Sequence, residues 1–313
     1  MQKQLPIIND GDSIVPYKKA MEANMKKFGK ILVAVLMLAT LVGACFAFTA
    51  CNKTEVTKVK VIDIELTEES YAFALKKGDT AMADAANSLL SELKENGELD
   101  NIVNAFFEGT ATFTYENPAS KDGCLVVATN AQFPPFEYKQ GNKFTGVDIQ
   151  IAKLLADKLG KTLYVDDMDF DAALLSVSGV NPTADLAMAG ITVNEERLKT
   201  MDFTDTYYTS AQVIIVKEND TTFDNCKTAA DVENILKAQS KSYTIGTQNG
   251  TTGFMYSNGD AGFGYDGFGN LTTAGYQNGA LAVQDLSKGK INAVIIDKQP
   301  ALMISESVNA NIK

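Results

Sequence analysis

The sequence predicts an α/β fold built from two units, and two patterns support this prediction. From residue 125 onward, short apolar runs alternate with segments of helical period, which is typical of a parallel sheet flanked by helices. The same rhythm resumes after residue 217, so we expect two such units to join there. With 313 residues and 45% hydrophobic content, the chain is long enough to bury a sizeable core.

Two helices are predicted ahead of these units. Between Tyr71 and Phe107 the apolar residues recur with helical period, and Asn96-Gly97 is expected to separate one helix from the next. Residues 108–123 are rich in Thr, Ser, Gly and Asn and contain a proline, which predicts a linker.

The remaining elements follow from the same two periods. The expected strands are 125–129, 163–166, 185–189, 213–217, 243–246 and 293–296, and the expected helices are 148–159, 172–177, 252–256 and 280–288. Residues 257–279 show neither period and are dominated by Gly, Asn, Asp and aromatic residues. They predict an irregular surface loop rather than a calcium loop, because the acidic spacing does not match an EF-hand.

The composition excludes several classes of function. The chain has no histidine, which rules out Ser-His-Asp and Cys-His hydrolysis and any zinc site that needs imidazole. The net charge of -11 argues against a nucleic-acid partner. These observations disfavour an enzyme, and no metal or cofactor site is predicted. Cys124 and Cys226 could form one disulfide or remain two free thiols, because their spacing decides nothing.

The first 51 residues contain a predicted secretion signal. The basic segment MKKFGK from Met25 precedes the apolar stretch Ile31–Ala50, and the sequence turns polar after Cys51. Small residues precede both Cys51 and Cys45, as in the lipobox of bacterial lipoproteins. We favour lipidation of Cys51, since the polar residues after it would form a water-compatible tether. The alternative is a transmembrane helix over Ile31–Ala50. Residues 1–24 fit no part of a signal, and a start codon assigned too far upstream explains them.

Several segments, in order and spacing, carry a resemblance to a known family. They are ATNAQFPPFEY, FTGVDIQIAKLLADKLG, MDFDAALLSV, DLAMAGITVNEERLKTMDFTDTYY and VIIVK between residues 125 and 217, and then IGTQNGTTG and LSKGKINAVIIDKQPA. The chain resembles bacterial extracellular solute-binding protein family 3, the polar amino acid binding proteins that include the glutamine-binding and lysine/arginine/ornithine-binding proteins.

The resemblance implies both a fold and a role. The implied fold is the type II periplasmic-binding-protein-like fold, in which each of two lobes is a mainly parallel sheet flanked by helices. The implied role is to close the lobes around a free L-amino acid and deliver it to the permease subunits of an ABC transporter. Such a protein would be a monomer, lipid-anchored at the extracytoplasmic face of the cytoplasmic membrane.

The resemblance also implies how the charged ends of the ligand are bound. Arg197 would clamp the α-carboxylate with Gly190 and Thr192 nearby, because a planar guanidinium makes two charge-assisted bonds to a carboxylate. Asp297 directly follows the strand AVII and would receive the ammonium group at the carboxyl end of that strand. Taken without its motif, Arg197 would instead be interpreted as a surface arginine on a helix.

The other implied ligand-binding residues come from both lobes. Thr251 and Thr252 would present backbone amides and a hydroxyl at a helix start, although a simple N-cap explains them equally well. Phe133 and Phe170 would sandwich the ligand side chain, with core packing as the alternative. The remaining two implied residues are Asn130 and Gln248.

Two questions about selectivity and activity stay open at this stage. Asn130 stands where family members often have an acidic residue, which favours a neutral polar amino acid. A dehydratase on the same scaffold, with Glu137 as its acid, and the sensor domain of a receptor are the alternatives to a transport protein.

The order of the segments suggests a circular permutation. Residues 56–107 resemble the end of a family member, yet here they come first. Lobe 1 would then span residues 71–216 with the internal linker 108–123, and lobe 2 would combine residues 56–70 with 217–313. The hinge would lie near Ser70 and Lys217. The alternative is a truncated gene in which the resemblance of residues 56–107 is accidental.

Overall fold

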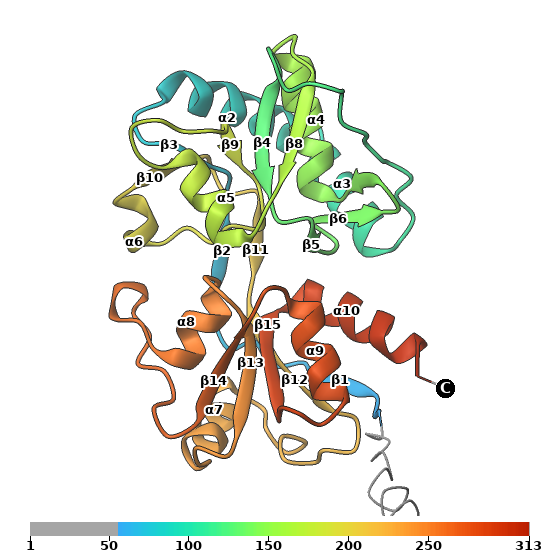
Figure 1. Cartoon of the computed structure of the whole chain (residues 1–313), viewed down its shortest axis with the longest axis vertical. Coiled ribbons are helices and arrows are strands. Elements are labelled where there is room, and N and C mark those ends of the chain that lie inside the picture. Colours follow the sequence, from blue (N-terminus) through green and yellow to red (C-terminus); the bar gives the residue numbers. More distant parts are fainter. Residues whose placement is uncertain (1–55, 313) are drawn as a thin grey trace, which may run out of the picture. The chain divides into compact units, whose positions relative to one another are not determined.

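A computed structural model describes residues 56–312, which form two lobes, each built around a five-stranded sheet (Figure 1). The predicted signal at residues 1–51, with Cys45 and Cys51, lies outside the described residues. Within residues 56–312, every helix is too short or too polar to cross a membrane, and no group of His, Cys, Asp or Glu side chains is arranged to hold a metal ion.

Lobe 1 has the sheet order β10-β3-β9-β4-β8. These strands are β3 (Ala74–Lys76), β4 (Leu125–Thr129), β8 (Leu163–Asp167), β9 (Leu186–Ala187) and β10 (Met201–Phe203). Its helices are α2 (Thr80–Glu95), α3 (Glu98–Phe107), α4 (Val147–Lys158), α5 (Phe170–Val177) and α6 (Glu195–Leu198). A small antiparallel sheet adds β5 (Gln132–Phe133), β6 (Glu137–Gln140) and β7 (Lys143–Thr145).

Lobe 2 has the sheet order β1-β12-β15-β13-β14. Its strands are β1 (Val59–Ile62), β12 (Gln212–Lys217), β13 (Thr244–Gln248), β14 (Thr272–Tyr276) and β15 (Ala293–Asp297). Its helices are α7 (Ala229–Lys237), α8 (Thr252–Asn258), the short 3₁₀ helix η1 (Ala261–Phe263), α9 (Gly279–Ser287) and α10 (Lys298–Ala310).

Two neighbouring segments carry the chain between the lobes. β2 (Glu69–Tyr71) and β11 (Tyr208–Ser210) pair with each other as antiparallel strands. The boundary expected near Lys217 is therefore wrong, because β12 pairs with β1 and β15 inside the sheet of lobe 2. The chain crosses at β11 instead, a few residues earlier.

Each sheet is mainly parallel, with one strand that runs against the others. In lobe 1, β4 runs parallel to β8 and β9, whereas β3 is antiparallel to β9 and β10. In lobe 2, β13 runs parallel to β14 and β15, whereas β12 is antiparallel to β1 and β15. The strand that runs against the others is β3 in lobe 1 and β12 in lobe 2, and each directly follows one of the crossing segments, β2 or β11.

Two segments expected to be irregular differ in outcome. Residues 257–279 contain the edge strand β14, so the prediction of a loop throughout this segment is wrong. Residues 108–123 contain neither helix nor β-ladder, but they are held to lobe 1. The backbone of Tyr115 pairs with that of Phe144, and the Asn117 side chain donates to the Val165 carbonyl over 2.7 Å. Cys124 and Cys226 are free thiols.

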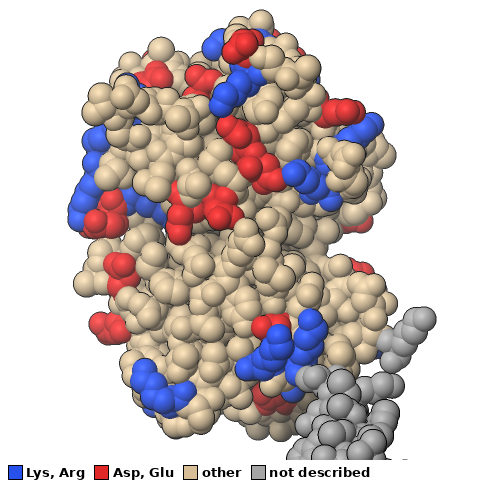
Figure 2. Space-filling model, viewed as in Figure 1, with Lys and Arg blue, Asp and Glu red and all other residues tan. Residues whose placement is uncertain are grey.

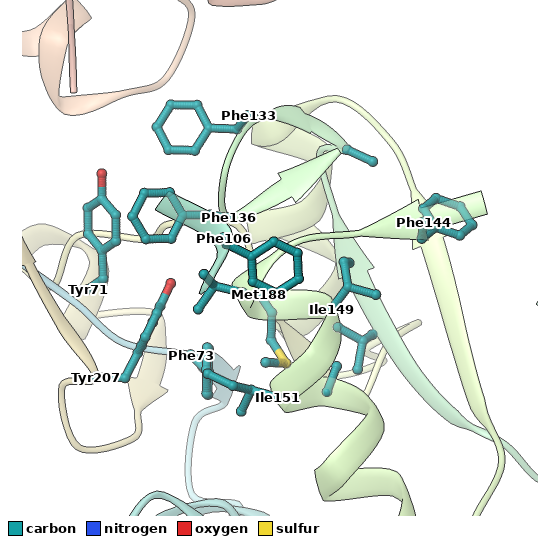
Figure 3. Close-up of a cluster of buried hydrophobic side chains, with 14 of the residues drawn as sticks. Tyr71, Phe73, Phe106, Phe133, Phe136, Phe144, Ile149, Ile151, Met188 and Tyr207 are labelled. Carbon is teal, nitrogen blue, oxygen red and sulfur yellow. The ribbon is translucent and has the colours of Figure 1, made fainter. Parts of the chain in front are cut away.

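The core of lobe 1 positions one wall of the site described below. Phe73 and Tyr207 stack with ring centroids 4.5 Å apart, and Tyr71 meets Phe136 edge to face at 5.2 Å. Figure 3 shows Phe133 at one edge of this cluster, apart from the deeper rings. The aromatic core therefore fixes the side chains that border the space between the lobes.

The charged side chains of the surface are mixed in sign. On the face shown in Figure 2, lysines and arginines form small separate groups beside acidic residues rather than one continuous basic patch.

Candidate functional site

A pocket of about 320 Å³ lies between the lobes. It is lined by Asn130, Phe133, Glu137, Phe170, Ala189, Gly190, Thr192, Arg197, Gln248, Thr251, Thr252 and Asp297. All ten residues that the sequence nominated for ligand binding are among these, and Glu137 and Ala189 complete the lining. The structure thus brings together residues that lie up to 167 positions apart in the chain, from Asn130 to Asp297.

Arg197 is a buried cation held from both lobes. Asn194 caps the helix α6 by accepting a hydrogen bond from the Arg197 amide, which fixes where the side chain starts. The guanidinium donates to the Thr192 carbonyl over 2.7 Å in lobe 1 and to the Gly250 carbonyl over 3.1 Å in lobe 2. It also lies over the Phe170 ring, 5.4 Å from the centroid. Burial lowers the pKa of Arg197 to about 10, so the group remains protonated at neutral pH.

Asp297 ends the strand β15 and is only 5% exposed. Its carboxylate accepts a hydrogen bond from the Tyr71 hydroxyl, which comes from the crossing strand β2. Burial, and next the negative charge of Glu69, raise the pKa of Asp297 to about 7. A cation that enters the pocket would therefore favour the ionised form of Asp297.

Glu69 and Tyr71, both on β2, are functional candidates that the sequence patterns did not reveal. Glu69 is buried and accepts hydrogen bonds from the Thr192 hydroxyl over 2.5 Å and from the Gln212 amide over 2.8 Å. Its charge also acts favourably on Arg197. Neither residue belongs to a recognisable motif, since their partners lie more than a hundred positions away in the chain.

Gly190 and the two phenylalanines shape the pocket wall. Gly190 has a φ of 55°, and a Cβ atom there would lie 2.8 Å from the Phe133 ring, so only glycine fits without strain. The Gly190 amide donates to Asp148 over 3.1 Å. Phe133 and Phe170 are each 7% exposed and line the pocket, which makes them part of both the core and the site.

Hydrogen bonds between side chains join the lobes around the pocket. The Gln248 amide donates to the Asn130 carbonyl oxygen over 3.0 Å, and the Thr252 hydroxyl donates to the Thr192 hydroxyl over 3.2 Å. Thr251 is the N-cap residue of α8, but its hydroxyl donates to the Gln248 carbonyl and makes no side-chain cap bond to the helix. The lobes are therefore shut around the pocket.

Glu137 is a buried acid at the pocket wall. It is fully buried, and its carboxyl group shares a hydrogen bond with that of Asp148. Burial, and next the charge of Asp148, raise the pKa of Glu137 well above its ordinary value. Burial also raises the pKa of Asp148 to about 6, against the hydrogen bond that Tyr207 donates to it over 2.6 Å. Two acids thus lie together on one side of the pocket.

Comparison with known proteins identifies the fold and the family. The sequence profile of the bacterial extracellular solute-binding proteins, family 3, matches residues 125–295. The chain belongs to this family. The match begins at β4 and ends in β15, so it includes the pocket residues of both lobes except Asp297, which lies just beyond it.

Two curated relatives of this solute-binding protein are both named as arginine-binding proteins. The arginine-binding extracellular protein ArtP of Bacillus subtilis is 39% identical over 95 residues, which are 30% of this chain and 36% of ArtP. The ABC transporter arginine-binding protein 1 of Escherichia coli is 29% identical over 188 residues, which are 60% of this chain and 68% of that protein. The chain thus spans about a third of the length of ArtP and about two thirds of the other relative.

Solved structures support the same fold. An ancestral arginine-binding protein bound to arginine is 32% identical, with a TM-score of 0.50, and the match covers 61% of this chain and 76% of that one. The ancestral amino acid-binding protein AncCDT-1, a precursor of cyclohexadienyl dehydratase, is 29% identical with a TM-score of 0.50, covering 60% and 75%. The relatives and solved structures named here are all binding proteins by name.

Proposed function

We propose that this protein is the extracytoplasmic substrate-binding component of an amino acid ABC uptake system. The observation that carries the proposal is that Arg197 and Asp297 line one buried pocket between the lobes. A guanidinium and a carboxylate match the two charges of a free amino acid, the first through paired bonds to a carboxylate and the second through contact with an ammonium. The relatives support an amino acid ligand, although their names differ in its side chain, from arginine to cystine to histidine.

Lobe closure is the proposed binding mechanism. Arg197 belongs to lobe 1 and Asp297 to lobe 2, so a ligand that touches both favours the shut state. The paired strands β2 and β11 are the only described segments that link the sheets by the chain, and they would serve as the hinge. Closure would present a combined surface of both lobes to the permease subunits.

The anchor and the rearranged chain order are further parts of the proposal. Lipidation of Cys51 would hold the monomeric protein at the extracytoplasmic face of the membrane. A circular permutation is supported by the coverage of the structural matches, which leave about a quarter of each neighbour and about two fifths of this chain unmatched. It is also supported by the packing of α2 and α3 against α4 and by the pairing of β1 with β12, which place residues 56–107 inside both lobes.

A thermal-shift screen of the twenty amino acids, followed by calorimetry, tests the binding function. An amino acid at about a hundred times its dissociation constant should stabilise the protein by roughly 2.7 kcal/mol. Arg197→Ala and Asp297→Ala should abolish measurable binding, whereas Lys199→Ala, which removes an exposed cation two residues from Arg197, should not. Retained affinity in either of the first two variants would contradict the assigned roles.

A dehydratase is the second candidate function. It is favoured by the similarity to AncCDT-1 and by Glu137, a buried acid that lines the pocket. An assay for turnover of prephenate-like substrates separates the two functions, and we expect no turnover.

A further inference from the structure

The buried charges of the described residues are strongly unbalanced toward acid. The buried charged side chains of residues 56–312 are Glu69, Glu137, Asp148, Arg197 and Asp297, four acids and one cation. Three of them line the pocket, and the other two touch its lining, Glu69 at Thr192 and Asp148 at Gly190. A neutral amino acid brings one positive and one negative charge and leaves this imbalance as it is.

The unused hydrogen-bonding capacity of the pocket lies on acceptors. Among the lining residues that the structure describes, the side-chain oxygen of Gln248 has no hydrogen-bond partner, and the Glu137 carboxyl group is bonded only to another acid, Asp148, which leaves carboxyl lone pairs free to accept from a ligand. The Gln248 oxygen is identified by its neighbours, because Asn130 donates its own amide to the Met168 carbonyl over 2.8 Å and thereby turns its oxygen toward the Gln248 amide. An unpaired buried acceptor costs about 1–3 kcal/mol, so a ligand that donates to these oxygens gains from satisfying them.

Among residues 56–312, no cation acts on Glu137 to neutralise it. The charges that act on it most strongly, those of Asp148 and Asp297, are both negative. Arg197, the only cation that lines the pocket, is bonded to the carbonyls of Thr192 and Gly250. Asn130 cannot take the place of an acid, because its oxygen already accepts from Gln248.

We propose that the pocket selects an amino acid whose side chain ends in a cation, and that Glu137 is the specificity-determining residue. The inference rests on the proposed amino acid binding and adds the class of side chain to it. Asn130 alone favoured a neutral ligand. The acid that is absent at position 130 is instead provided by Glu137 on β6, so we now expect a cationic side chain. A guanidinium suits the site best, since it carries only donors and its plane can stack on the rings of Phe133 and Phe170.

Calorimetry with L-arginine, L-citrulline and L-glutamine tests the proposal on the wild-type protein. Citrulline keeps the length of arginine but ends in a neutral group with a carbonyl, so it isolates the contribution of charge. We expect arginine to bind about ten- to a hundredfold more tightly than either neutral ligand, as for a buried hydrogen bond to a charged group. Equal or tighter binding of citrulline or glutamine would overturn the inference and leave the proposed function intact. The absence of binding by all twenty amino acids would overturn both.

Two variants assign the selectivity to Glu137. In Glu137→Gln the preference for arginine over citrulline should fall about tenfold or more, while citrulline affinity changes little. The same change at the exposed Glu195 should leave the preference unaltered. Arginine should also release more protons than citrulline in wild type, measured by calorimetry in buffers of different ionisation enthalpy, because a cation beside Glu137 favours loss of its proton. An unaltered preference in Glu137→Gln, or equal proton release by the two ligands, would overturn the assignment.

Discussion

Asp297 should make amino acid binding weaken as the pH falls. In the empty pocket its pKa is raised to about 7, first by burial and then by the charge of Glu69. An ammonium group needs the ionised carboxylate as its partner, so below pH 7 the ligand must displace a proton before it binds. Because the pKa of Asp297 is higher in the free protein than in the complex, the affinity for the amino acid is high above pH 7 and is lost below it.

The size of the effect follows from these two pKa values. An opposite charge in contact lowers a carboxyl pKa by about 1 to 3 units, which places that of the complex between about 4 and 6. Linkage then weakens binding between about 7-fold and 70-fold from pH 7.5 to pH 5. The other groups that act on Asp297 are the hydroxyls of Tyr71 and Ser210, the side chain of Gln212 and the guanidinium of Arg197. None of them loses a proton in this range.

Calorimetric titration with the most stabilising amino acid of the screen, at several pH values between 5 and 7.5, measures this dependence. Asp297→Asn should bind more weakly by about 2–5 kcal/mol, with a much flatter profile. Asp205→Asn, which changes an exposed aspartate, should keep the wild-type profile. If the wild-type protein binds equally well at pH 5 and pH 7.5, the ammonium does not meet Asp297.

Three other substitutions test separate contacts of the pocket. Arg197→Lys should weaken amino acid binding by about 2–5 kcal/mol in calorimetry, because an ammonium cannot form the paired carboxylate bonds; wild-type affinity would refute the clamp. Tyr71→Phe removes the hydroxyl that stabilises the ionised form of Asp297, so the midpoint of the pH profile should move upward, and an unchanged midpoint would show that this bond is unimportant. Gly190→Ala places a Cβ 2.8 Å from the Phe133 ring at a φ of 55°. It should therefore lower the unfolding free energy by about 1–3 kcal/mol in denaturant titration and also weaken amino acid binding. Wild-type stability and affinity would mean that Phe133 and the backbone move to accept the methyl group.

The elements that sequence periodicity predicted well are those with a strong apolar pattern. The helix expected at 148–159 is α4 (Val147–Lys158), and the strand expected at 125–129 is β4. Both elements pack most of their residues into the core, so their buried positions are apolar and give the sequence a clear period.

Elements at the rim of the fold were harder to predict. β14 is an edge strand paired only with β13, and its residues Thr272–Tyr276 are half-buried or exposed. Threonine, alanine and glycine in such a strand leave no alternation of apolar and polar residues to detect. Its position follows from the register with β13, which is a contact between distant segments rather than a local pattern.

The residues of the candidate site also differ in whether a local sequence motif or only a distant contact reveals them. The motif around Arg197 could be recognised because its residues are contiguous, and the pocket indeed gathers all ten nominated residues. Glu69 and Tyr71 could not, since they act through residues 123 and 226 positions away, Thr192 and Asp297 respectively. Glu137 was visible as an acid in PPFEY, but only the structure shows that it is buried beside another acid, Asp148, rather than beside a cation.

The position of the crossing strands explains why a hinge could survive a change in chain order. β2 and β11 lie beside each other, and each joins the sheet of one lobe to the sheet of the other, β2 from β1 to β3 and β11 from β10 to β12. Neither crossing includes the linker at 108–123, which stays within lobe 1 through its bonds to Phe144 and Val165. Moving the chain ends to the linker, or away from it, therefore changes only the connections inside a lobe. The lobe closure proposed here depends on the two adjacent crossings, and both are kept whatever the order of the segments in the chain.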